Sequence, residues 1–418
     1  MMKIIHNISE CVTVAGGPRR GKAMSDLAII RDAAIVISEE KIIAVGDSKE
    51  LMAKYPQAER IDAQGRAVVP GFVDPHTHLI WVGDRANEFE MRLQGKSYME
   101  IMNAGGGILA TLTATRQADL ETMMAQSRER AVRAFRYGTT TMEAKTGYGL
   151  DLETEFRQLE AILELNKEGP IELVPTYMGA HAIPKDYPGG VRGYTDWLCD
   201  VALPETKKWW LEHAEGQALP FNDVFCEQGV FEIEDTRKIL LKGQELGFRS
   251  KLHADEFVNL GGASLAAELG AISADHLVKT SQEDILRLAG SDTVAVSLPG
   301  TPFGLAQAEY TPAREIIDAG GYLALATDLN PGTTWNESMQ FIQALACRYM
   351  KLTPAEALVA STINAAKAIG LEDKVGSIEV GKQADLLILT VNDYRHLTYR
   401  YGTNLVAEVF KKGERFSV

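Results

Sequence analysis

Two histidines separated by one residue follow a short apolar run near residue 70. The run Val68-Val69-Pro70-Gly71-Phe72-Val73 leads into Asp74-Pro75-His76-Thr77-His78. This pattern predicts a strand over residues 69–78, and side chains at i and i+2 of a strand leave the same face. Imidazole nitrogens that converge on one point bind transition metals. A pair of polar residues at a strand end explains the motif equally well, so other residues must decide between the two interpretations.

Further candidate residues fall where other predicted strands end. Five of the eight histidines do so, namely His76, His78, His181, His253 and His276, and the eighth strand ends at Asp328. Barrel enzymes place their chemistry at the C-terminal ends of the strands, which gather at one rim. Histidines scattered through a core or over a surface would not collect there. His6, His213 and His396 do not fit this pattern and are interpreted as ordinary polar residues.

Four of these side chains form a predicted set of metal ligands: His76, His78, His253 and Asp328. Nitrogen and oxygen ligands without sulfur suit Zn²⁺, Fe²⁺ or Mn²⁺, and do not choose among them. Such a metal lowers the pKa of bound water toward ~7. Barrel hydrolases with two metals commonly need a lysine on the fourth strand, and residues 223–227 carry none. We therefore predict one metal ion per chain.

Other polar residues near the same rim suit work on a substrate. Glu256, three residues after His253, could hold and shuttle protons on a heterocycle, whereas Asp255 suits a solvated loop. His276 is free either to polarise a carbonyl or to handle the proton of a water molecule. The planar guanidinium of Arg85 suits a substrate carboxylate.

Additional candidates are weaker when taken singly. Tyr98 and Tyr148 offer hydroxyl donors, and the turn Asn330-Pro331-Gly332-Thr333 offers backbone groups directly after Asp328. Each of these residue types is more often structural, so their interest lies in their grouping.

Eight apolar segments alternate with helical patterns between residues 69 and 328. The predicted strands are 69–78, 139–145, 171–181, 223–227, 248–253, 271–276, 293–298 and 322–328, with helices over 118–137, 235–246 and 282–288. Alternation of this kind predicts a parallel sheet. Eight β/α units in about 260 residues match a (β/α)₈ TIM-like barrel, with a doubly wound open sheet as the alternative. No G-x-G-x-x-G follows the first strand, which weakens the dinucleotide-binding version of that alternative.

Short β-strands are predicted near both ends of the chain. Segments 33–37 and 41–45 flank a polar turn and predict a hairpin. After a helix pair over 353–371, short strands are predicted at 376–382, 384–389 and 407–410. We expect residues 1–68 and 373–418 to form a small β-sandwich beside a barrel of residues 69–372.

Composition excludes several classes of protein. The 418 residues are 45% hydrophobic and 24% charged, as in an ordinary globular protein. A net charge of −14 without a basic run argues against a nucleic-acid surface, and no apolar run approaches the ~20 residues that span a membrane. Four widely spaced cysteines and the lack of a signal peptide predict a cytoplasmic protein with reduced thiols.

These motifs together resemble the metal-dependent amidohydrolases, and within them the imidazolonepropionase family. The superfamily likeness rests on residues 70–78, Thr327-Asp328 and the tail Gly376-Ser377-Ile378-Glu379-Val380-Gly381-Lys382-Gln383-Ala384-Asp385-Leu386. The narrower likeness rests on Gly83-Asp84-Arg85, Glu143-Ala144-Lys145-Thr146-Gly147-Tyr148-Gly149-Leu150, His253-Ala254-Asp255-Glu256-Phe257, Ser273-Ala274-Asp275-His276-Leu277 and residues 326–332. It covers nearly the whole chain.

The resemblance implies an activity and a role for each candidate. The reaction would open the lactam of 4-imidazolone-5-propanoate with water, in histidine degradation, giving N-formimidoyl-L-glutamate. The implied metal, zinc or iron, is held by His76, His78, His253 and Asp328. Arg85, Tyr98 and Tyr148 would hold the propionate, His181, Glu256 and Thr333 would contact the ring, and Asn330 and Gly332 the product. His276 and Asp328 would manage the proton of the attacking water.

The family pattern is not matched everywhere, and other functions compete. Leu329 stands where phenylalanine is usual, and Thr146 where serine is common. The first alternative is another amidohydrolase, such as a deaminase of a heterocyclic base. The second is a barrel that kept its fold without catalysis, which predicts lost ligands. A small substrate with a carboxylate is the expected partner, and a homodimer is a further expectation.

Overall fold

Eight parallel strands form one of the two sheets of the computed structural model, which describes residues 2–96, 100 and 106–418. They are β6 (Phe72–Asp74), β7 (Thr139–Lys145), β8 (Glu172–Ala180), β9 (Phe221–Cys226), β10 (Ser250–Ala254), β11 (Ser273–His276), β12 (Val294–Ser297) and β13 (Leu323–Leu325). Each pairs with the next in chain order. Beyond β6 and β13, Thr77 bridges Leu329 in parallel, which draws the two outer strands together. The predicted (β/α)₈ barrel is confirmed, and the open doubly wound sheet is not found.

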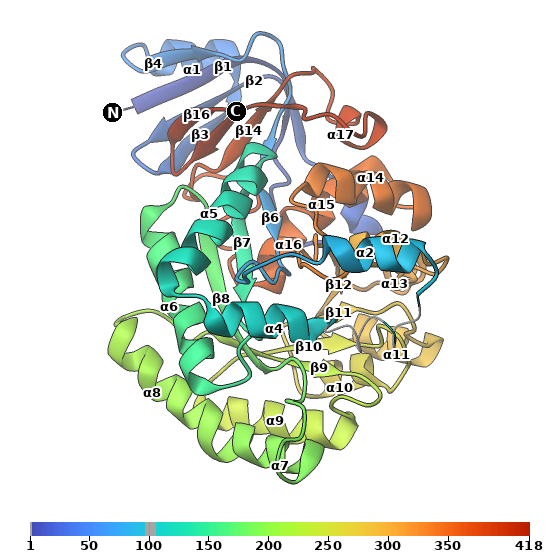
Figure 1. Cartoon of the computed structure of the whole chain (residues 1–418). Helices are drawn as coiled ribbons and strands as arrows, with labels where there is room; N and C mark the ends of the chain where they lie inside the picture. The colour runs from blue at the N-terminus through green and yellow to red at the C-terminus, as the bar shows by residue number, and fades with distance from the viewer. Residues whose placement is uncertain (1, 97–99, 101–105) are drawn as a thin grey trace.

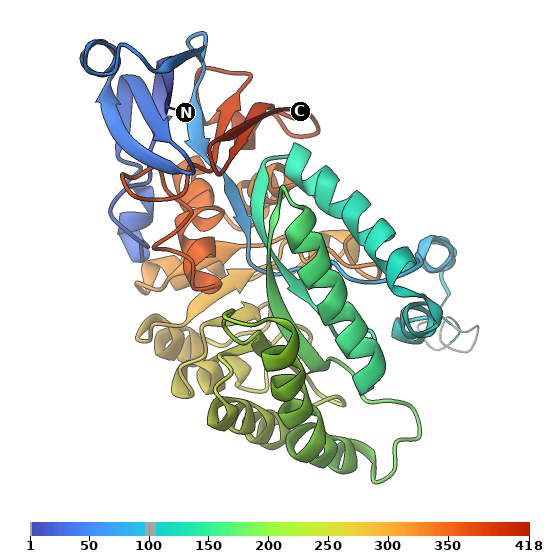
Figure 2. The ribbon, with the colours of Figure 1, turned by 90° about the vertical axis from the view of Figure 1, so that its left-hand side faces the viewer.

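Helices cover the outside of this barrel (Figure 1). They are α4 (Ile108–Gln117), α5 (Leu120–Arg136), α6 (Leu152–Glu168), α7 (Gly190–Trp197), α8 (Leu203–His213), α9 (Ile233–Leu246), α10 (Gly262–Glu268), α11 (Gln282–Ala289), α12 (Gly300–Gly304), α13 (Ala313–Asp318), α14 (Met339–Tyr349), α15 (Pro354–Ala360) and α16 (Ile363–Ala368). The other helices are η1 (Gly21–Ser25), α1 (Ser48–Lys54), η2 (Leu198–Ala202) and α17 (His396–Tyr399), and α2 (Ala86–Leu93) lies after the first barrel strand. In Figure 2, α5 and α6 run side by side along the barrel.

Helix α5 illustrates how local sequence sets an element. Asp119 caps its first turn by accepting a hydrogen bond from the backbone N–H of Thr122 at 2.8 Å. Its buried face includes Met123, Ala134 and Phe135. The helix ends before Gly138, whose φ of +99° lies in the left-handed region that favours glycine. The predicted helix over 118–137 is therefore confirmed.

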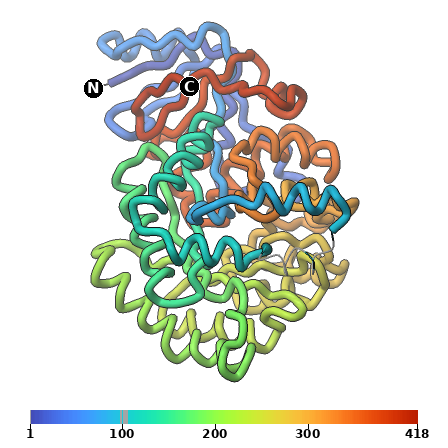
Figure 3. Tube along the Cα trace, in the orientation of Figure 1, coloured from blue at the N-terminus to red at the C-terminus, as the bar shows by residue number. Residues whose placement is uncertain are grey.

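The two chain ends meet in a second, mixed sheet. Its strands are β1 (Met2–Val12), β2 (Ile29–Ser38), β3 (Lys41–Asp47), β4 (Glu59–Asp62), β5 (Val68–Pro70), β14 (Leu386–Leu389), β15 (Val406–Lys411) and β16 (Glu414–Ser417). The order is β16-β15-β14-β5-β1-β2-β3, with β4 beside β1. Figure 3 shows the first and last segments of the chain lying together above the barrel. The predicted hairpin over 33–45 and the joining of both ends are confirmed.

Two local predictions were wrong. The segment 69–78 is not one strand, because it divides at Gly71 into β5 in the mixed sheet and β6 in the barrel. A Cβ on Gly71 would lie 2.4 Å from Thr140 Oγ1, so the crossing requires glycine. The segment 376–382 is irregular, since Gly376 and Gly381 have φ values of +86° and +91°. Among the described helices, none is long and apolar enough to cross a membrane.

Candidate metal centre and active site

The barrel seam brings the histidine pair to Asp328. The backbone N–H of Asp328 donates to the carbonyl of His76 at 3.1 Å, and that of His78 donates to Leu329 at 2.9 Å. Asp74 reinforces the seam, because its Oδ1 accepts from Thr327 N at 3.0 Å and its Oδ2 from Thr327 Oγ1 at 2.5 Å. Burial raises the pKa of Asp74 to about 7. Residues about 250 positions apart therefore share one rim.

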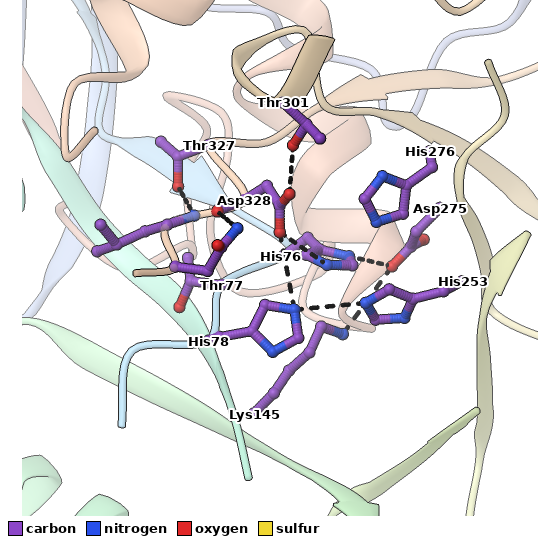
Figure 4. Close-up of polar contacts among 12 residues, drawn as sticks. His76, Thr77, His78, Lys145, His253, Asp275, His276, Thr301, Thr327 and Asp328 are labelled. Atoms are coloured by element: carbon purple, nitrogen blue, oxygen red, sulfur yellow. Dashed lines mark hydrogen bonds and ion pairs between the residues drawn. The ribbon is translucent and has the colours of Figure 1, made fainter. Parts of the chain in front are cut away.

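Three imidazoles and one carboxylate converge at this rim (Figure 4). Nitrogens of His76, His78 and His253 lie within 4.8 Å of one another, and so do ligand atoms of His76, His276 and Asp328. Asp328 Oδ1 lies 3.5 Å from His76 Nε2 and 3.7 Å from His78 Nε2. These four side chains and that of His276 are buried.

Carboxylates behind the histidines set their orientation. His76 Nδ1 lies 2.6 Å from Asp275 Oδ2, and His253 Nδ1 lies 3.0 Å from Asp223 Oδ2. A carboxylate accepts the N–H of such a ring and leaves the lone pair of the other nitrogen free. His76 Nε2 is fully buried without a hydrogen-bond partner among the described residues. An unpartnered buried nitrogen beside a carboxylate fits a bound cation, so the donor set passes this test for a divalent metal.

Two buried lysines hold these carboxylates. Lys145 Nζ lies 2.6 Å from Asp223 Oδ2, 2.9 Å from Glu143 Oε2 and 4.0 Å from Asp275 Oδ2. Lys251 lies 3.4 Å from Glu143 and donates to the carbonyl of Pro75 at 2.9 Å. Burial lowers the pKa of Lys145, but the three carboxylates raise it by more, so the ammonium stays charged.

Three side chains beside the histidine cluster, those of Glu256, His276 and Asp328, have pKa values shifted from their ordinary ranges. Burial raises the pKa of Glu256 well above its ordinary range, with a further rise from Asp328. Burial lowers the pKa of His276 well below its ordinary value, and its Nε2 lies 3.6 Å from Glu256 Oε2. Burial also raises the pKa of Asp328 to about 6, although Thr301 Oγ1 donates to its Oδ2. Burial therefore favours the protonated form of the Glu256 carboxyl group and the neutral form of the His276 imidazole beside it.

A cavity of about 400 Å³ opens onto these groups. The candidate residues that line it are His78, Arg85, Tyr148, His181, His253, Glu256, His276, Asp328, Asn330, Gly332 and Thr333. His76 lies buried beneath it, and Tyr98 lies outside the described residues. Candidate residues that are up to about 250 positions apart in the sequence therefore line one cavity, and the cationic Arg85 is one of them.

Fixed hydrogen bonds orient the remaining lining residues. His181 Nδ1 lies 3.0 Å from the Gly147 carbonyl, and its ring stacks on His78 at 4.8 Å. Burial lowers the pKa of His181 to about 3, so its ring is neutral. Asn330 Oδ1 accepts from the backbone N–H groups of Gly332 and Thr333 at 2.8 and 2.9 Å, which holds the turn after Asp328.

Sequence reasoning missed several residues that touch this site. Asp223 and Asp275 were not assigned to the histidines, and Lys145 was noted only as lying at the end of the second strand. A usable signal existed, because charged residues inside otherwise apolar strands must find partners when buried. No such signal marks Thr301, which reaches Asp328 from the start of α12.

The comparisons with known proteins agree with this geometry. Two models described as amidohydrolase family match residues 59–104 and 246–416. An adenosine deaminase from Xanthomonas campestris, whose crystal structure contains bound zinc, superposes with a TM-score of 0.72 at 19% identity, covering 99% of this chain and 92% of that one. E. coli guanine deaminase gives 0.74 at 16% identity, covering 100% and 99%. The barrel and its rim of histidines define an amidohydrolase.

Relatives of similar sequence identify the family within the amidohydrolases. Imidazolonepropionase from Herpetosiphon aurantiacus is 50% identical over 411 residues, covering 98% of this chain and 96% of the relative. Imidazolonepropionases from Symbiobacterium thermophilum and Alkaliphilus oremlandii are 48% and 45% identical, each with the same coverage. The chain belongs to the imidazolonepropionase family.

Proposed function

We propose that this chain hydrolyses the lactam C–N bond of 4-imidazolone-5-propanoate to N-formimidoyl-L-glutamate. The observation that carries the proposal is one cavity with histidines and carboxylates at its base and Arg85 in its wall. Full-length relatives named imidazolonepropionase support the same reaction. The cluster of histidines and carboxylates suits hydrolysis of the substrate ring, and Arg85 suits binding of the substrate carboxylate.

In this proposal, His76, His78, His253 and Asp328 hold one divalent ion, zinc or iron. When bound, the ion supplies Lewis acidity that makes water acidic near neutral pH. The Oδ1 atom of Asp328 is turned toward the histidines because Thr301 occupies Oδ2. The Asp328 carboxylate also accepts a proton from the attacking water.

Two further groups act on the lactam itself. Neutral His276 polarises the ring carbonyl as the water oxygen bonds to its carbon. Burial raises the pKa of Glu256 and so favours its protonated form, from which it gives a proton to the nitrogen that leaves when the C–N bond breaks. Arg85 and Tyr148, with Tyr98, bind the propionate. His181 and Thr333 contact the ring, whereas Asn330 and Gly332 contact the formimidoyl-glutamate frame of the product.

An absorbance assay with product analysis tests the proposal. The ultraviolet band of imidazolone propanoate should bleach and formimidoyl-glutamate should accumulate without ammonia release. Arg85→Met should lower kcat/KM by about 10- to 100-fold, since a charge-assisted hydrogen bond contributes about 1.5–3 kcal/mol. Ammonia release would instead indicate the alternative, a deaminase of a heterocyclic base. Metal-loaded protein without turnover would refute the assignment.

The proposal also covers the metal count, the assembly and the location. We infer one ion per chain, a homodimer and a cytoplasmic protein. The four described cysteines, which form no disulfides, support only the cytoplasmic location. Elemental analysis, light scattering and cell fractionation test these three statements.

A further inference from the structure

Helix α2 buries one of its side chains, and that side chain is a carboxylate. Glu88 is buried, whereas Phe89 and Leu93 on the same helix are 51% and 74% exposed. A surface helix ordinarily packs through its apolar residues. A buried carboxylate costs free energy unless it is paired, so the contacts of Glu88 explain why it occupies this position.

Both carboxylate oxygens of Glu88 have partners in the site. Its Oε2 accepts from Arg85 Nε at 2.9 Å and lies 2.9 Å from Arg85 Nη2. Its Oε1 accepts from the backbone N–H of Gly107 at 2.9 Å. Glu88 therefore engages the side edge of the guanidinium and fixes its plane, while the end that carries Nη1 makes no contact with Glu88.

The Arg85 guanidinium packs closely against Gly332. A Cβ built on Gly332 would lie 2.5 Å from Arg85 Nη1 and 3.1 Å from its Cζ. The next nearest atom, Asn330 Oδ1, is 3.3 Å away. Because Asn330 also holds the backbone of Gly332, a methyl group there would displace the guanidinium before it displaced the turn. Glycine at this position thus makes room for Arg85.

These contacts lie at the wall of the active-site cavity. Arg85 and Gly332 line both that cavity and a neighbouring one of about 710 Å³. A flexible arginine loses conformational freedom when it binds an anion, and this loss weakens binding. Contacts that fix the side chain beforehand remove much of that loss and select the place where a carboxylate can bind.

We propose that Glu88 and Gly332 are positioning residues that fix the guanidinium of Arg85 and thereby give the site its selectivity for a carboxylate-bearing substrate. This inference rests on the proposed function, because it assigns the substrate carboxylate to Arg85. It predicts that disturbing either residue weakens binding of the anionic group specifically, and leaves recognition of the ring intact. A structural role alone predicts equal losses for charged and neutral ligands.

Calorimetric titration of the metal-loaded protein separates these cases. The probes are 3-(imidazol-4-yl)propanoate and its primary amide, which share the ring and differ in charge. Glu88→Gln and Gly332→Ala should each weaken the acid about 5- to 10-fold and change the amide by less than twofold. Glu90→Gln, on the exposed part of the same helix, should change neither.

Each other outcome overturns the proposal. Equal losses for the acid and the amide assign Glu88 to holding α2, and an unchanged acid affinity removes Glu88 from the recognition of anions. An unmodified protein that binds both probes equally removes the role of Arg85. Failure of the proposed function would give a different result: the protein would still bind the acid more tightly than the amide, but it would not hydrolyse imidazolone propanoate.

Discussion

Lys145→Met tests whether the buried ion network supports the fold beneath the active site. Lys145 and Lys251 together face three buried carboxylates: Glu143, Asp223 and Asp275. Methionine approximates the volume of lysine but removes the only ammonium within 3 Å of Asp223 among the described residues. Removing one partner of a buried pair typically costs about 3–5 kcal/mol, because it leaves an uncompensated charge. We expect a loss of that size in the free energy of unfolding.

Urea titration of the metal-free protein, followed by tryptophan fluorescence, measures this loss without any contribution from bound metal. The matched control is Lys167→Met, which removes an exposed pair with Glu164 and should change stability by less than about 0.5 kcal/mol. Lys145→Met leaves three buried carboxylates facing Lys251 alone, so adding Glu143→Gln lowers the excess of buried negative charge and should restore part of the loss. A loss below about 1 kcal/mol, or a double variant less stable than Lys145→Met, would refute the reasoning.

Two further predictions concern metal and acid. His253→Ala should lower metal content from about one ion per chain to below about 0.1 by elemental analysis, whereas His213→Ala, at an exposed histidine, should not; retained metal would contradict the ligand assignment. Burial raises the pKa of Glu172, but Lys411 and other neighbours lower it by more, from 4.5 to about 2. Since the folded pKa is the lower one, a contribution of about 3 kcal/mol is present above pH 4.5 and is lost as the pH falls toward 2. Glu172→Gln should flatten the pH dependence of unfolding by urea between pH 5 and 3, and an unchanged slope would rule this out.

Much of the fold could be predicted because its signals are local. Alternating apolar segments and helical patterns identified all eight barrel strands, and the helical spacing of apolar residues over 118–137 located α5. The division of residues 69–78 could not be predicted. It depends on how closely Gly71 passes Thr140, a contact between segments that are separate in sequence.

The candidate site was predictable for a different reason. The C-terminal ends of the parallel strands of a barrel lie at one rim. A histidine at such a strand end can therefore be placed at that rim before its partners are known. This rule anticipated the grouping of His76, His78, His253 and Asp328. It said nothing about charged side chains inside the barrel, so the roles of Asp223 and Asp275 remained unassigned.

The sequence by itself determined the residue types and their positions along the strands: imidazoles with their i, i+2 spacing, the late aspartate, and an arginine suited to a carboxylate. Only the tertiary structure decided which of them meet. Closure of the barrel places Asp328 beside His76, burial raises the pKa of Glu256, and Glu88 orients Arg85. Proton affinity and side-chain orientation depend on desolvation and on neighbours far away in the chain, and these exist only once the chain has folded.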